Sequence, residues 1–171
     1  MTTRLTRLTI VMLVAAGLAY RGDVRADGPA AAASQRVRPP AVAGQFYPAE
    51  AKALAGAIDL LLKDAVAAGP ETPVALVVPH AGYAYSGQIA ADAWRQTQGR
   101  QYDTVVILGT NHTTAGFDRI GVYPGSGLRT PLGVVRVDEG LSAALIEEDA
   151  DCVADATVHE KEHSLEVQLP F

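Results

Sequence analysis

The chain has 171 residues, of which 49% are hydrophobic and 19% are charged, and its formal net charge is −5. This length and composition indicate one globular domain with an ordinary core, and they exclude a disordered or strongly basic chain. Cys152 is the only cysteine, which excludes an internal disulfide and a metal cage built from several cysteines.

The first 26 residues have the pattern of a secretory signal peptide. Arg4 and Arg7 precede the apolar run LTIVMLVAAGLA, and Val24-Arg25-Ala26 supplies small residues for cleavage after Ala26. The run is short for a membrane-spanning helix, so export to the periplasm or the outside is expected, with an uncleaved membrane anchor as the alternative. Cleavage would remove four basic residues and one acidic residue, which moves the formal charge from −5 to −8. That charge argues against nucleic acid as a partner, and no membrane contact is expected after cleavage.

A flexible leader and a helix are expected next. Residues 27–40 are small, polar and end in two prolines, so the folded part is expected to begin near Ala41 and to run to residue 171. From Ala49 to Ala68 apolar residues recur at helical spacing, between Pro48 and Gly69-Pro70, and predict an amphipathic helix.

The middle of the chain predicts a strand, a helix and a second strand. PVALVVP at 73–79 and TVVILG at 104–109 are short runs rich in β-branched residues, and a helical pattern runs from about Ile89 to Gln98 between them. This order is typical of a parallel βαβ unit.

The remaining pattern completes an α/β fold class with a mixed, largely parallel sheet flanked by helices. The later strands are expected at Arg119–Pro124 and Val134–Val137, and the later helices at Glu139–Glu148 and His163–Leu169. The sequence has no internal repeat and no phosphate-binding glycine loop of recognised spacing.

Two histidines directly follow predicted strands. His80 follows ALVVP, and His112 follows VVILGTN. Ligands of a parallel sheet collect at the carboxyl ends of its strands, so both imidazoles are expected to face one cleft and to hold one metal ion. In a loaded site their ligating nitrogens would lie about 3–3.5 Å apart. A hydrogen-bonded loop histidine explains either residue alone, and the joint placement favours a site.

The segment HEKEH at 159–163 fits the H-E-x-x-H pattern of zinc proteases. On a helix, His159 and His163 would share one face, with Glu160 as the general base. Such sites need a third protein ligand after the motif, and Glu166 is too near for the commonest arrangement. A zinc hydrolase is therefore the least favoured of the function hypotheses.

Five blocks of the sequence resemble the Memo family, whose bacterial members are called AmmeMemoRadiSam system protein B. The blocks are PAVAGQFYPAE (40–50), VVPHAGYAYSG (77–87), VVILGTNHT (105–113), RTPLGVVRVDE (129–139) and EHSLEVQLPF (162–171). They occur in the family's order and cover the chain from Pro40 to its last residue. The resemblance implies an α/β fold similar to the class III extradiol dioxygenases, which hold non-haem iron through two histidines and a carboxylate.

Memo-like proteins offer two histidines and a cysteine in place of that set. The resemblance assigns the histidines to His80 and His112, and it puts the cysteine downstream of EHSLEVQLPF. Cys152 precedes that block and is expected to be a buried small residue. The chain is therefore expected to be C-terminally truncated, to lack the third ligand and to self-associate through an exposed strand edge.

Further residues are candidates for a ligand pocket. The resemblance places pocket aromatics at Phe46 and Tyr85. His163 and Glu166 can reach the rim, although a solvated helix face is the favoured explanation for both. Asp138 has the position of a helix N-cap.

Two main function hypotheses follow from these residues. One is a metal-dependent redox enzyme of dioxygenase type, with iron or copper favoured over zinc and an unspecified substrate. The other is a non-catalytic module that binds a peptide or small molecule in the same cleft. Metal content distinguishes the two.

Overall fold

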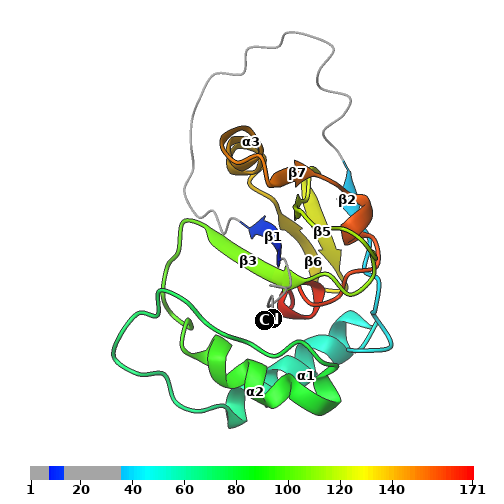
Figure 1. Cartoon of the computed structure of the whole chain (residues 1–171). Helices are drawn as coiled ribbons and strands as arrows, with labels where there is room; N and C mark the ends of the chain where they lie inside the picture. The colour runs from blue at the N-terminus through cyan, green and yellow to red at the C-terminus, as the bar shows by residue number, and fades with distance from the viewer. Residues whose placement is uncertain (1–7, 14–35) are drawn as a thin grey trace, which may run out of the picture.

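The computed structural model describes residues 8–13 and 36–171 (Figure 1). These residues form a mixed α/β fold with two small sheets. The expected cleavage site after Ala26 and most of the leader at 27–40 lie outside the described residues. None of the helices within the described ranges is long and apolar enough to cross a membrane.

The larger sheet has the strand order β3-β1-β4-β7. Its strands are β3 (Val105–Thr110), β1 (Leu8–Leu13), β4 (Ile120–Val122) and β7 (Cys152–Ala154). Strand β1 is antiparallel to β3 and parallel to β4, and β4 is parallel to β7. Cys152 is buried and unpaired, as the sequence predicted.

The smaller sheet has the order β2-β5-β6. It contains β2 (Val37–Arg38), β5 (Gly127–Thr130) and β6 (Gly133–Arg136), with β2 parallel to β5 and β5 antiparallel to β6. Because β2 precedes Ala41, the folded part begins earlier than the sequence indicated. The prolines after Arg38 made this segment resemble a flexible leader. The segment is ordered because the buried Arg38 forms an ion pair with Glu166, which lies far away in the sequence.

Two of the three described helices were predicted at about the right place. They are α1 (Ala51–Asp64) and α3 (Glu139–Glu148). Asp138 is the N-cap of α3 and accepts a hydrogen bond of 2.9 Å from the Leu141 N–H, which satisfies one of the free donors at the helix start.

The third helix, α2 (Tyr83–Arg95), begins six residues before the predicted start at Ile89. The helical pattern recognised in the sequence does not include Tyr83 and Tyr85, but both lie in the first turn of α2, and Gly82 precedes the helix as its N-cap. In Figure 1, α1 and α2 lie side by side and apart from α3.

Two predicted elements were wrong. Residues 73–79 form no strand, and Val74 and Val77 are fully exposed. A β-branched run becomes a strand only when it pairs with a neighbour, and within the described residues β3 pairs with β1 instead. The helix predicted at His163–Leu169 is only a short 3-10 helix, η3 (Glu166–Gln168), and most of this segment is buried.

The C-terminal segment joins two core clusters. Leu165 packs with Tyr123, Leu128 and Val137, whereas Val167 packs with Tyr47, Leu54 and Ile58. Residues 162–171 therefore lie between the sheets and the helix pair, where they contact both histidine-bearing segments.

Candidate metal centre

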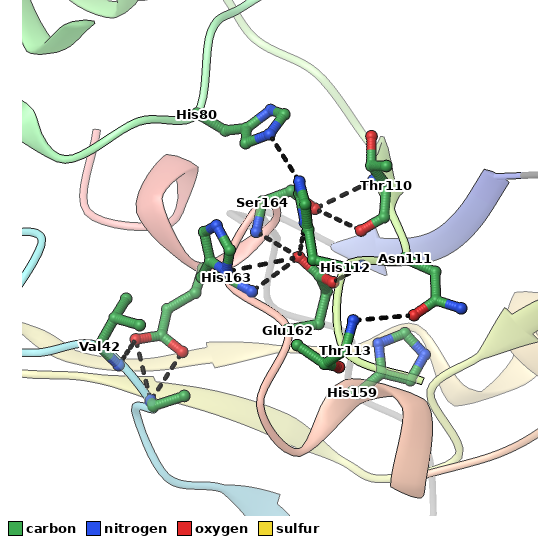
Figure 2. Close-up of polar contacts among 12 residues, drawn as sticks. Val42, His80, Thr110, Asn111, His112, Thr113, His159, Glu162, His163 and Ser164 are labelled. Carbon is green, nitrogen blue, oxygen red and sulfur yellow. Dashed lines mark hydrogen bonds and ion pairs between the residues drawn. The ribbon is translucent and has the colours of Figure 1, made fainter. Parts of the chain in front are cut away.

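His80 and His112 lie together in the structure. Their Nε2 atoms are 3.4 Å apart and their ring centroids 5.1 Å apart, and Figure 2 shows the two rings pointing toward one another. Imidazole nitrogens bind divalent metals at about 2.0–2.1 Å, so this separation suits two ligands of one ion.

His80 is positioned by a hydrogen-bonded side chain rather than by a strand. The buried Gln168 donates from Nε2 to the carbonyl of Pro79 at 3.0 Å, and it accepts from Trp94 Nε1 at 2.9 Å. The residue before His80 is thus tied to both η3 and α2, which explains how His80 reaches the site although no strand precedes it.

His112 is positioned by the turn that follows β3. Asn111 Oδ1 accepts hydrogen bonds from the backbone N–H groups of Thr113 and Thr114, and its Nδ2 donates to the carbonyl of Thr114. An asparagine that bonds to the backbone two and three residues ahead stabilises a tight turn. The turn leaves His112 at its tip, with 35% of its side chain exposed.

The end of β3 contacts residues 164–165 closely at Gly109. A Cβ atom built on Gly109 would lie 2.4 Å from Ser164 Oγ and 2.6 Å from Leu165 Cδ2. Ser164 Oγ also accepts from the Thr110 N–H at 3.1 Å. A residue larger than glycine would push β3 away from this segment.

We expect Gly109→Ala to destabilise the protein by about 1–3 kcal/mol, because the added methyl overpacks a closed contact. The free energy of unfolding in urea measures the effect. Gly56→Ala is the matched control, since a Cβ at Gly56, in α1, meets nothing within 4 Å and alanine favours a helix. A Gly109→Ala protein as stable as the wild type would show that the contact is not closed in solution.

Glu162 is a buried carboxylate that was not among the candidates predicted from the sequence. Its side chain is 0% exposed and lies beside His112, with Oε1 3.0 Å from Nδ1 of that ring. Burial raises the pKa of Glu162, but hydrogen bonds from His112 and Ser164 outweigh it and lower the pKa to about 2. The carboxylate is therefore ionised at neutral pH.

His163 joins the histidine pair. Its ring stacks on His112 with centroids 4.6 Å apart, and Phe46 contacts it edge-on at 4.8 Å. Burial lowers the pKa of His163, so the ring favours its neutral form. Two of the expected pocket residues, Phe46 and His163, are thus in contact with each other. The third, Tyr85, lies on α2 with 90% of its surface exposed.

The donor set suits a transition metal. His112, Glu162 and His163 form a group whose ligand atoms all lie within 4.8 Å of one another, and His80 approaches the same ring of His112 from another segment. Imidazole and carboxylate are ligands of iron, copper and zinc. The residues present thus fit a bound metal ion.

The HEKEH segment does not assemble the pair that a zinc protease needs. His159 is buried in the 3-10 helix η2 (Thr157–His159), and its Nε2 lies 3.1 Å from the carbonyl oxygen of Gly121. His163 stacks on His112 instead, and Glu160 is exposed. The helix that would place both imidazoles on one face is absent from this described segment.

Glu166 is fully buried, so its interpretation as part of a solvated helix face was wrong. It pairs with Arg38 and accepts hydrogen bonds from Tyr47 Oη at 2.7 Å and from the Ala41 and Val42 N–H groups. One signal in the sequence pointed to Glu166, which stands between Leu165 and Val167, because a charge in an apolar and buried segment requires a partner. Glu162 lies between Lys161 and His163 and carries no such signal.

Comparison with known proteins agrees with the resemblance of the five blocks. The family described as Memo-like protein matches residues 38–171. The MEMO1 family proteins of Methanopyrus kandleri and Aquifex aeolicus are each 42% identical to the chain, over 143 and 140 residues. That of Ignicoccus hospitalis is 43% identical over 145 residues. The chain belongs to the Memo family.

The matches cover much of this chain and half of each relative. They include 78%, 80% and 79% of the chain, but 50%, 49% and 50% of the proteins from Methanopyrus kandleri, Aquifex aeolicus and Ignicoccus hospitalis. The chain thus spans about half the length of the curated relatives it matches.

Proposed function

We propose that this chain carries a metal site for redox chemistry, in which His80 and His112 are ligands of an iron or copper ion. The observation that supports the proposal is the 3.4 Å separation of their Nε2 atoms, although the two residues come from different segments. Iron or copper bound there would supply electron exchange with oxygen or an organic substrate. The likeness of the family to class III extradiol dioxygenases agrees with this reaction class.

The protein's own groups around the pair have separate roles in this proposal. Burial lowers the pKa of His163, so its neutral ring would lie beside the ligands with a nitrogen free to accept a proton from a bound substrate. Phe46 packs against the His163 ring and limits its rotation. A cavity of about 580 Å³ adjoins His80 between residues 73–80 and β3, a volume typical of small-molecule sites.

The second candidate function is a binding module that uses the same cavity without chemistry. The observation that favours it is the apolar lining of the cavity by Val74, Leu76, Val106 and Leu108. Such a surface suits an apolar small molecule or peptide segment. A partner of this kind would bind equally well with or without metal.

Metal analysis of the full chain tests the proposal. We expect the purified protein to bind added Fe(II) or Cu(II) weakly, since two imidazoles rarely hold an ion tightly. His80→Ala and His112→Ala should each reduce the bound metal measured by titration and by elemental analysis after desalting. Glu160→Gln is the matched control, because it removes the supposed base of HEKEH and leaves the pair intact.

Two results would contradict the proposal. Metal that survives both histidine substitutions would place the site elsewhere. A wild-type chain that binds no iron or copper, but binds apolar ligands, would favour the binding module.

A further inference from the structure

Glu162 lies in an unusual concentration of hydrogen-bond donors. Its Oε1 accepts from the N–H groups of His163 and Ser164, each at 2.8 Å, and lies 3.0 Å from His112 Nδ1. Its Oε2 accepts from the His112 backbone N–H at 2.8 Å. Figure 2 shows these contacts converging on one carboxylate.

This arrangement determines which nitrogen of the His112 ring carries the hydrogen. An ionised carboxylate accepts hydrogen bonds and has no proton to donate, so His112 Nδ1 must carry the hydrogen that lies between them. In a neutral imidazole the other nitrogen, Nε2, then has the free lone pair. This is the nitrogen that lies 3.4 Å from His80 Nε2.

We propose that Glu162 is a positioning residue that holds His112 in the Nδ1–H tautomer and turns its Nε2 lone pair toward His80. The proposal rests on the proposed metal site, because a free lone pair at this place serves to bind a metal ion. Carboxylates that accept from the second nitrogen of a ligating histidine are common in metal sites and raise the basicity of the ligand.

A direct ligand role for Glu162 is the competing interpretation. The carboxylate offers about four lone-pair sites, and Oε1 already accepts or adjoins three N–H donors. A metal ion at Oε1 would displace at least one of these donors from a fully buried place, which is costly. The geometry therefore favours support of His112 over coordination.

The first test reads the tautomer without metal. In the full, metal-free chain labelled with ¹⁵N at histidine, imidazole shifts near neutral pH should assign His112 to the Nδ1–H form. Glu162→Gln should shift His112 toward the Nε2–H form or a mixture, because the amide group presents a donor where only acceptors fit. Glu162→Asp should restore the wild-type form in part.

His159 is an internal reference in the same spectra. Its Nε2 faces the carbonyl oxygen of Gly121, so it carries the hydrogen on Nε2 in every variant that keeps the fold. The matched control is Glu160→Gln, which alters an exposed acid two residues before Glu162. It should change the tautomer of neither His112 nor His159.

The second test measures metal affinity with Co(II) as the probe. Glu162→Gln should weaken Co(II) binding by about 10–100-fold, the usual effect of removing a group that orients a ligand.

An Nε2–H form of His112 in the wild type would overturn the proposal, and so would a tautomer that Glu162→Gln leaves unchanged. Loss of Co(II) with an unchanged tautomer would identify Glu162 as a direct ligand. If the tautomer responds as expected but the wild type binds no metal, the positioning role stands and the proposed function fails.

Discussion

Glu166→Gln should destabilise the protein by about 3–5 kcal/mol, which is a large part of the stability of an ordinary domain. The substitution keeps the size of the side chain but leaves the buried Arg38 guanidinium without its counter-charge. It also places an amide N–H₂ group against the donors that now point at the carboxylate, from Tyr47 Oη and the N–H groups of Ala41 and Val42. Urea unfolding, followed by fluorescence, measures the loss.

Two further variants show whether the ion pair is the cause. Glu160→Gln alters an exposed acid in the same segment and should change the free energy of unfolding by less than about 0.5 kcal/mol. Arg38→Met combined with Glu166→Leu removes both charges and should recover part of the stability. Recovery should be incomplete, because Arg38 also donates to the carbonyls of His159 and Glu162. If the free energy of unfolding of Glu166→Gln lies within about 0.5 kcal/mol of the wild-type value, as for a surface substitution, the pair has no structural role.

The elements that the sequence predicted well are those whose signal is local. The apolar spacing of α1 and the Asp138 cap of α3 lie within the helices they define, so a single window of sequence contains the information. Residues 73–79 show the opposite case. Their composition suits a strand, but pairing depends on which other segment lies beside β3.

The candidate site was predictable in part for the same reason. His80 and His112 were recognised by their position after β-branched runs, and they do lie together. Their supports were not predicted, because Gln168 reaches Pro79 and Glu162 reaches His112 across 89 and 50 positions of the chain. Such distant contacts leave no periodic pattern, and a buried carboxylate looks like a surface residue when its partner is unknown.

The buried His159 should make stability depend on pH. Burial is the main cause that lowers the pKa of this ring to about 4, and the nearby Arg38 lowers it further, although the hydrogen bond to the carbonyl of Gly121 opposes the change. In the unfolded chain the ring has its ordinary pKa of 6.5. Between these values the unfolded chain binds the proton and the folded chain does not.

The sign of the effect follows from this difference in bound protons. The stabilisation from neutral His159 is complete above the unfolded pKa, and it is lost as the pH falls toward the folded pKa. Between about pH 7 and about pH 5 we expect the free energy of unfolding to fall by about 2 kcal/mol from this residue alone.

Urea unfolding of the wild type and of His159→Gln at both pH values measures it. The variant is expected to be less stable at pH 7, since it loses a packed ring beside Tyr123, but its stability should fall less between the two conditions. Glu162 contributes little to the difference between the two proteins. Because its pKa is lowered in the fold, its stabilisation is lost only as the pH falls below the ordinary carboxyl pKa, and this happens in both proteins. Equal pH slopes in the two proteins would mean that His159 is protonated in the fold and that its environment is more open to water than its contacts indicate.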